Sequence, residues 1–95
     1  MISFTVRMTF HAEDRVEIGE ALRRLAATSR QEPGCVSYVA HTVVGDPDTV
    51  LIYEQYADEA AAEAHRHSAH FKKYAVGVLY QKMRERFRED LIALE

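Results

Sequence analysis

Several residue types are scarce in this chain, and each shortage excludes a class of protein. Its 95 residues include one cysteine, Cys35, so no intrachain disulfide can form and a cysteine-rich structural zinc site is excluded. We expect Cys35 to be a small buried side chain, because free cysteine usually is. No apolar run approaches the length of a membrane-spanning helix, so no membrane partner is expected.

Positive charge is scarce as well. The 12 lysines and arginines stand against 15 aspartates and glutamates, which gives a net charge of −3. A nucleic-acid-binding protein needs a basic face to neutralise phosphates, so this class is excluded. The first residues lack the basic and then apolar segments of a signal peptide, and we therefore expect a cytoplasmic protein.

What the chain does contain begins with a strand and an amphipathic helix. Residues 2–10 alternate between apolar and polar side chains, as in a strand with one buried face. Helical spacing over residues 13–31 predicts a buried stripe of Ile18, Ala21, Leu22, Leu25, Ala26 and Ser29. Pro33 and Gly34 are expected to end this helix, the glycine by adopting a left-handed conformation.

A β-hairpin is predicted next. β-Branched and aromatic residues fill 35–44 and 49–56, and turn-forming residues at 45–48 separate them. Both faces of these strands carry apolar groups; Val36 and Tyr38, for example, are placed on one face. Something must therefore cover each side of the sheet.

Two helices and a closing strand complete the pattern. Asp58 is suited to cap a helix over 59–67, and Ser68 to cap a second helix over 69–83. We expect the last strand at 88–94.

The order β-α-β-β-α-β predicts one domain over residues 1–95 of the α+β class. It is the order of the ferredoxin-like fold, a four-stranded antiparallel sheet with both helices on one face. The other face stays partly apolar, and a core of this size is modest. We therefore expect a homodimer that packs sheet against sheet.

Three histidines, His65, His67 and His70, lie beside the aromatic residues Phe71 and Tyr74. Groups that titrate near neutral pH next to aromatic surface suit a pocket for a flat, ionisable organic molecule. On a continuous helix His65 and His67 would point about 200° apart, so we do not expect the three imidazoles to bind one metal ion.

The strand before these histidines places Glu54 and Tyr56 on one face. The Tyr56 hydroxyl is able to hydrogen-bond a substrate oxygen. A core-facing Glu54 is costly unless it is paired, so we expect it to orient a histidine or to bind an arginine such as Arg7.

Together these segments resemble the antibiotic biosynthesis monooxygenase domain family along nearly the whole chain. The resemblance rests on an ordered set of segments: Glu32-Pro33-Gly34-Cys35, Tyr53-Glu54-Gln55-Tyr56, Asp58-Glu59-Ala60-Ala61, and His65 followed by Ser68-Ala69-His70-Phe71. The resemblance implies a dimeric α+β barrel with a ligand pocket between sheet and helices. Many members are described as oxygenases of quinols or polycyclic phenols that use neither metal nor flavin.

Some positions depart from the family pattern. Antibiotic-tailoring members commonly carry tryptophan where this chain has Tyr56. The heme-degrading branch uses Asn, Trp and His where Val6, His65 and Ala75 stand here, so heme cleavage is not expected. A third branch isomerises a phosphorylated autoinducer sugar, and its tyrosine-rich strand end is similar to the segment Leu51–Tyr56.

The sequence thus predicts an enzyme that oxidises a small hydroxyaromatic or quinol with O₂ and without a cofactor. In this hypothesis His65 or His70 removes the phenolic proton and Tyr56 positions the oxygen. Glu54, Phe71 and Tyr74 are expected to contact the substrate. Two alternatives stay open: a dimeric module that binds an aromatic metabolite without converting it, and a sugar-phosphate isomerase. The isomerase requires a basic group in the pocket, to be drawn from Arg7, Arg66, Lys72 and Lys73.

Overall fold

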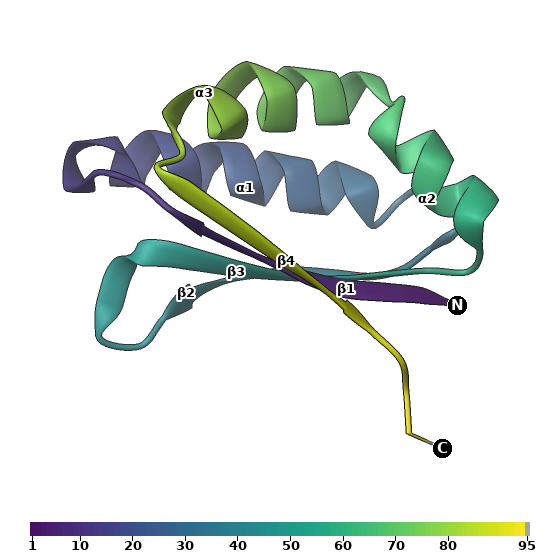
Figure 1. Cartoon of the computed structure of the whole chain (residues 1–95). Helices are drawn as coiled ribbons and strands as arrows, with labels where there is room; N and C mark the ends of the chain where they lie inside the picture. Colours follow the sequence, from purple (N-terminus) through teal and green to yellow (C-terminus); the bar gives the residue numbers. More distant parts are fainter. Residues whose placement is uncertain (95) are drawn as a thin grey trace.

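The computed structural model describes residues 1–94 of the chain. Its elements follow one another in the order β-α-β-β-α-β, with short helical extensions (Figure 1). They are β1 (Ile2–Thr9), η1 (Ala12–Asp14), α1 (Arg15–Ser29), β2 (Cys35–Val43), β3 (Asp46–Tyr56), α2 (Glu59–Arg66), η2 (Phe71–Leu79), α3 (Tyr80–Lys82) and β4 (Glu85–Leu91).

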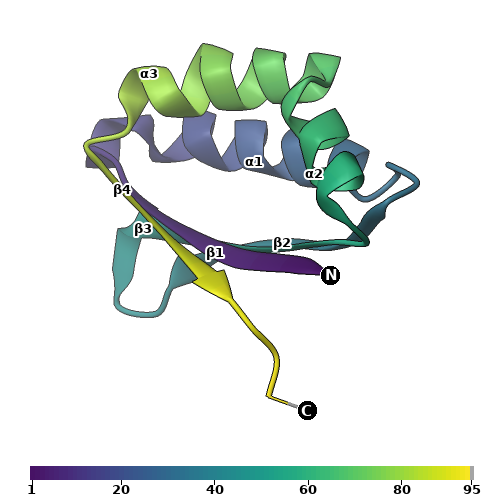
Figure 2. The ribbon, with the colours of Figure 1, turned by 45° about the vertical axis from the view of Figure 1, so that its right-hand side comes forward.

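The four strands form one antiparallel sheet in the order β2-β3-β1-β4. All helices lie on one face of this sheet, and the opposite face is bare (Figures 1 and 2). The predicted ferredoxin-like fold is therefore confirmed. Because β1 and β3 are the central strands, residues that point from them toward the helices lie in the middle of the protein.

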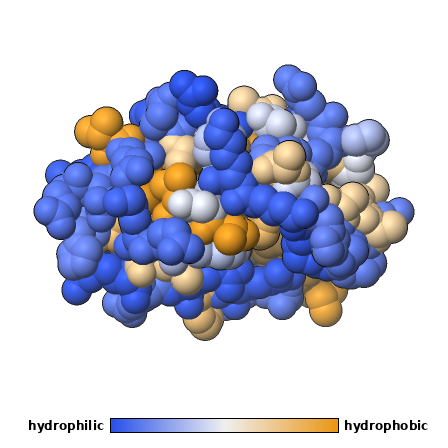
Figure 3. Space-filling model, turned by 90° about the horizontal axis from the view of Figure 1, so that it is seen from above, coloured by the Kyte–Doolittle hydropathy of each residue, from blue (hydrophilic) through white to orange (hydrophobic). Residues whose placement is uncertain are grey.

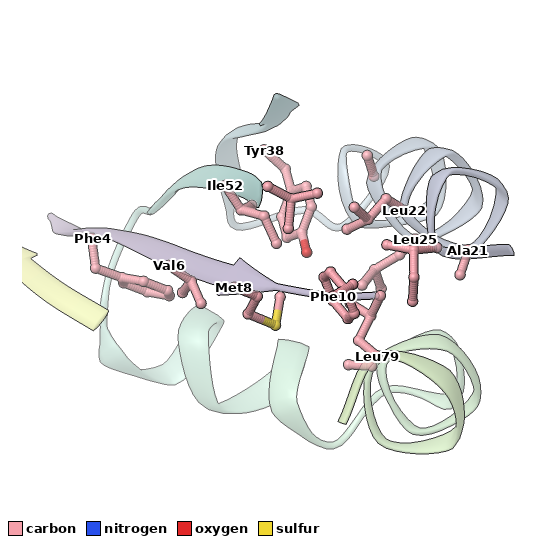
Figure 4. Packing of buried hydrophobic residues seen from close by; sticks show 14 of the residues in the cluster. Phe4, Val6, Met8, Phe10, Ala21, Leu22, Leu25, Tyr38, Ile52 and Leu79 are labelled. Atoms are coloured by element: carbon pink, nitrogen blue, oxygen red, sulfur yellow. The ribbon is translucent and has the colours of Figure 1, made fainter. Parts of the chain in front are cut away.

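The hydrophobic core lies between the sheet and the helices. Phe4, Val6 and Met8 point from β1 toward side chains of α1 and η2 (Figure 4). All six residues of the stripe predicted for α1 are buried. Each large apolar side chain buried in this way contributes roughly 1.5–3 kcal/mol relative to exposure.

The hairpin differs from its prediction in two ways. Its turn is shorter than expected, because β2 ends at Val43 and β3 begins at Asp46. The pairing also shifts between Cys35 and Ser37, which inserts Val36 as an extra residue. Val36 is consequently exposed, while Tyr38 faces the core, so the two do not share a face as predicted.

The predicted role of Gly34 is wrong. The one glycine with a positive φ among the described residues is Gly45, in the hairpin turn. Gly34 is needed for another reason: a Cβ at this position would lie 2.2 Å from the Cβ of Ala61 in α2. The turn at Pro33 therefore packs directly against the start of α2. Cys35, expected to be buried, is half-buried.

The second helical segment is capped as predicted but is not a regular α-helix. The Ser68 hydroxyl accepts a hydrogen bond from the Phe71 amide (3.1 Å) and donates one to the His65 carbonyl (2.7 Å). From Phe71 to Leu79 the segment is a π-helix, whose wider i→i+5 turns are rare in proteins. It buries Ala75 and Leu79 against the sheet.

The last strand spans Glu85–Leu91 and not 88–94 as predicted. The Met83 backbone is already extended, and the Arg84 amide donates to the Thr9 carbonyl (2.8 Å), which starts the pairing with β1. The predicted bounds of the strand were wrong because the apolar residues of β4 do not face the core. Its arginines point toward the helices, and its apolar residues Phe87 and Leu91 point toward the bare face.

The surface on the helix side is predominantly hydrophilic, with hydrophobic atoms exposed at a few places between the polar ones (Figure 3). In the part of the chain that the structure describes, none of the helices combines the length and the apolar character that crossing a membrane requires.

Candidate active site

A narrow cavity lies between the sheet and the segment that runs from α2 into η2. Its walls include the aromatic side chains of Phe4, Tyr38, Phe71 and Tyr80. In this conformation it has space for a few water molecules and is smaller than a cavity that takes an aromatic ring. A ring therefore enters only when lining side chains move, and Phe71 and Tyr80 are half-buried members of this lining.

The polar group at the floor of this cavity is Glu54 of β3, which is 6% exposed. The Tyr56 hydroxyl donates a 2.6 Å hydrogen bond to Glu54 Oε1. Burial raises the pKa of Glu54 to about 7, although the Tyr56 hydrogen bond and the positive charges of Arg88 and Arg86 oppose the rise. This carboxyl group is thus able to take or give a proton near neutral pH.

Tyr56 stays protonated beside it. The side chain is fully buried, and burial together with the neighbouring Glu54 raises the pKa of its hydroxyl far above the ordinary value. Tyr56 is therefore a permanent hydrogen-bond donor to Glu54 and not a base.

His65 of α2 lies between two carboxylates. Its Nδ1 contacts Glu32 Oε2 at 2.9 Å, and its Nε2 lies 3.7 Å from Glu54 Oε1. Burial lowers the pKa of His65, and the hydrogen bond with Glu32 opposes this shift. The arrangement is that of a neutral imidazole that donates Nδ1–H to Glu32 and turns its Nε2 lone pair toward Glu54.

Local sequence explains how Glu32 reaches His65. After α1, the Cys35 amide donates to the Glu32 carbonyl (3.1 Å) and closes a turn around Pro33 and Gly34. The contact of Gly34 with Ala61 brings this turn against α2, one helical turn before His65. The glycine thus permits the approach that lets Glu32 orient the histidine.

The break at Ser68 separates His67 from His70, and only His70 shares the partner Glu32 with His65. His70 contacts Glu32 through Nε2 and does not line the cavity, in contrast to its predicted role at the substrate. His67 is exposed, and its Nε2 contacts Glu63 at 2.6 Å. Of the three histidines, only His65 faces the cavity.

The aromatic residues predicted to wall the substrate also separate. Phe71 packs edge-on against the His65 ring, with centroids 5.2 Å apart, and lines the cavity. Tyr74 does not; it lies in a surface groove between α1 and η2, beside Ala21 and Val78. The proposed pairing of Glu54 with Arg7 is wrong as well, because Arg7 points to the bare face of the sheet.

Comparison with known proteins identifies the family to which the chain belongs. The family model described as "Antibiotic biosynthesis monooxygenase" matches residues 1–76, which include β1, β2, β3, α2 and most of the cavity walls. The chain belongs to this family of monooxygenases. A Bacillus subtilis (strain 168) family relative named "Putative monooxygenase YcnE" is 31% identical over 74 residues, 78% of each protein.

Solved structures have the same fold as this antibiotic biosynthesis monooxygenase domain. PA3566 from Pseudomonas aeruginosa superposes with a TM-score of 0.90 at 26% identity, over 99% of this chain and 94% of that one. Rv0793 from Mycobacterium tuberculosis superposes with a TM-score of 0.87 at 22% identity, over 99% and 95% of the two chains. The latter identity supports the fold alone.

Several cavity residues of this monooxygenase domain were not identified from the sequence. Glu32 entered the sequence analysis only within the segment Glu32-Pro33-Gly34-Cys35 that resembles the family, and its long-range contacts with His65 and His70 have no local signal. Arg86 and Arg88 line the cavity because β4 presents them inward. The predicted strand at 88–94 left Arg86 outside it, so the sequence did not place the two arginines on one face.

Proposed function

We propose that this protein is a cofactor-independent monooxygenase that oxidises a small hydroxyaromatic or quinol-type molecule with O₂. Its family supports a monooxygenase-type activity. The substrate class and the lack of a cofactor are the parts that we propose. The observation that carries them is a buried carboxyl group, Glu54, with a pKa near 7 at the floor of an aromatic cavity.

This observation matters because a phenol reduces O₂ readily only as its anion. A base that titrates near neutral pH is therefore the group that the reaction requires from the protein. We assign the role of this base to Glu54 and not to His70. His65, whose Nε2 lone pair faces Glu54, supports Glu54 in this role. Tyr56 orients Glu54 and holds its proton-accepting oxygen in place.

The reaction balances without an added reductant. Glu54 takes the phenolic proton, and the phenolate passes an electron to O₂. The resulting superoxide joins the aryloxyl radical at a ring carbon, and the peroxide receives the proton back from Glu54. Loss of the proton from that ring carbon then breaks the O–O bond, and the ring becomes a quinone. The hydroxide that leaves combines with this proton to form water. One O₂ thereby accepts four electrons from the ring.

The aromatic walls favour this assignment over sugar chemistry. Phe4, Tyr38, Phe71 and Tyr80 offer ring faces and edges to a flat molecule. A substrate ring that fills the cavity would displace water from it, and this water would otherwise intercept a radical pair.

A sugar-phosphate isomerase remains the second candidate because basic groups do line the cavity. Arg66, Arg86 and Arg88 are part of its wall, whereas Arg7, Lys72 and Lys73 are not. Arg66 is paired with Glu59 and Glu63, which reduces its capacity to bind a phosphate. Isomerisation consumes no O₂, so the two candidates separate in one experiment.

The test is turnover of a panel of naphthols, anthrones and quinols by metal-free protein, with and without O₂. We expect O₂-dependent conversion above the uncatalysed rate, and one ¹⁸O atom from ¹⁸O₂ in each quinone. Absence of any enzymatic rate across the panel contradicts the proposal. Conversion of a sugar phosphate under nitrogen would favour the second candidate.

Glu54→Gln tests the base directly. Glutamine keeps an oxygen to accept the Tyr56 hydrogen bond but cannot take a proton, so we expect kcat to fall by roughly 10²–10⁴. Glu13→Gln, on exposed η1, is the matched control and should keep the wild-type rate. Equal rates for the Glu54 variant and the wild type would remove Glu54 from this role.

We also propose that the protein works as a homodimer through the bare face of the sheet. Val39, Phe87 and Leu91 lie on this face and are 42%, 60% and 41% exposed. An apolar face of a small domain is a typical association surface. Covering it with a second copy would also fix β4, the strand that carries Arg86 and Arg88.

A further inference from the structure

A second group of titratable residues lies behind the cavity. Glu32 belongs to the turn after α1, His65 to α2, and His70 to the start of the segment that continues into η2. Each offers one ligand atom, and the three atoms lie within 4.8 Å of one another. The sequence gives no sign of this triad, because Glu32 is more than 30 residues away from both histidines.

The chemistry of the three atoms selects a class of ligand. Two imidazole nitrogens and one carboxylate oxygen form a set that suits Zn²⁺ and related divalent transition-metal ions. Calcium and magnesium ions prefer oxygen ligands only, so they do not fit. An analogous set of three protein ligands leaves a fourth position for water.

We propose that Glu32, His65 and His70 form a binding site for a divalent transition-metal ion of the Zn²⁺ class. This site goes beyond the proposed oxidation and does not supply a cofactor for it. Its ligand on His65 is Nδ1, the ring atom that faces Glu32, whereas Nε2 faces Glu54 and the cavity. The ion therefore binds on the side of the imidazole that faces away from the substrate.

Little movement converts the hydrogen-bonded triad into a coordination site. At metal–ligand distances of about 2.0–2.2 Å, tetrahedral ligand atoms lie about 3.3–3.6 Å apart. The Nδ1 of His65 and the nearer Glu32 oxygen are now 2.9 Å apart, so they must separate by less than about 1 Å. Glu32 is able to adjust because it lies on a turn, and its side chain is 16% exposed, as is that of His70. The same exposure gives an ion a path from solvent.

A bound ion would tie together three segments that are distant in sequence. It would hold the turn after α1, the end of α2 and the start of η2 at one point, and it would keep His65 oriented as Glu32 does now. We therefore expect binding to stabilise the fold. Because Nδ1 then gives its lone pair to the ion, the neutral imidazole carries its proton on Nε2 and presents an N–H to Glu54.

The experiment is a titration of tag-free protein with Zn²⁺ by isothermal titration calorimetry. We expect one ion per chain and no comparable heat with Mg²⁺. His70→Ala and, separately, Glu32→Gln should each weaken the affinity by about 10²-fold or more, because even outer-shell changes at metal sites cost 10–100-fold. His67→Ala is the matched control, since His67 lies three residues from His70 but outside the triad. It should bind as the wild type does.

Two readouts need no variant. Zn²⁺ at about a hundred times the Kd should raise Tm by about 10 °C or more. In imidazole NMR spectra the signals of His65 and His70 should shift on addition of Zn²⁺, while those of His11, His41 and His67 stay in place. No binding, equal weakening by His67→Ala, or shifts confined to the other histidines would each overturn the proposal. None of these measurements depends on turnover, so failure of the proposed oxidation leaves them interpretable.

Discussion

At the scale of single residues, Glu54 is the group whose position packing alone does not explain. An apolar residue at this site would join the core without any cost of burying a charge. The protein instead buries a carboxyl group and gives it one neutral donor, Tyr56, and a neutral imidazole, His65. Neither partner carries a positive charge that would neutralise the ionised carboxylate, so the pKa of Glu54 lies near neutral pH. Proton transfer is the function that such an arrangement suits.

Ionisation of Glu54 predicts a loss of stability at higher pH. The pKa of this carboxyl is about 7 in the folded protein, against 4.5 without the fold. Between these values the folded state binds more protons than the unfolded state, so the free energy of unfolding falls as pH rises. The loss attributable to this group amounts to about 3 kcal/mol between pH 4.5 and 7.

Urea unfolding of wild type and Glu54→Gln at several pH values measures this loss. The difference between the two proteins should change by that amount over the same pH range, in the direction that favours the variant at higher pH. Parallel pH profiles would show that Glu54 does not ionise there.

At the scale of elements, the turn between α1 and β2 determines the geometry of the site. It supplies Glu32, and its Gly34 lies so close to α2 that no larger residue fits. The capping residues Asp58 and Ser68 fix where α2 begins and where the next segment starts, through hydrogen bonds to the amides of Ala61 and Phe71. The turn and the helix therefore position His65 together.

Gly34→Ala should separate the turn from α2. The new methyl group would overlap with Ala61, and we expect a loss of roughly 1–3 kcal/mol of stability, typical of overpacking. The variant should also lose activity, because Glu32 moves away from His65. Urea unfolding and turnover measure the two effects.

The double variant Gly34→Ala, Ala61→Gly is the control for this contact. It removes the methyl group of Ala61 that the added Cβ at position 34 would meet. It should therefore recover most of the lost stability. The remaining loss is about 1 kcal/mol, because glycine is less favourable than alanine inside a helix. An additive loss in the double variant would show that the contact is not the cause.

At the scale of the whole molecule, the sheet is covered on one side only. The helices cover the inward face (Figure 1). Apolar residues from β2 and β4 remain exposed on the other face. A 95-residue chain has few other ways to add to its core than to associate with a second copy.

Phe87→Glu should convert the expected dimer into a monomer. The new carboxylate would place a charge in the apolar interface, yet within one chain it would lie opposite Arg7 on β1, so the fold itself should persist. Analytical ultracentrifugation gives the mass. Val16→Glu is the matched control, because Val16 is 86% exposed on α1, away from this face. If both variants have the mass of the wild type, the bare face is not the interface.

The sequence was sufficient for the fold because the necessary signals are local. Period-two alternation in β1, the helical stripe of α1 and the caps Asp58 and Ser68 each depend on residues a few positions apart. The order of elements then leaves few ways to build one sheet. The same reasoning failed at β4, where the inward positions hold Arg86 and Arg88 and no apolar alternation marks the buried face.

Only the tertiary structure decided which residues form the site. The sequence placed three histidines close together, but the roles of His65 and His70 depend on a partner, Glu32, that lies 33 residues before His65. A histidine facing water and one buried between two carboxylates have the same local sequence pattern. The burial of a histidine and its distance from charged groups set its protonation chemistry. Both arise when distant segments of the chain pack together, so a local sequence pattern does not predict them.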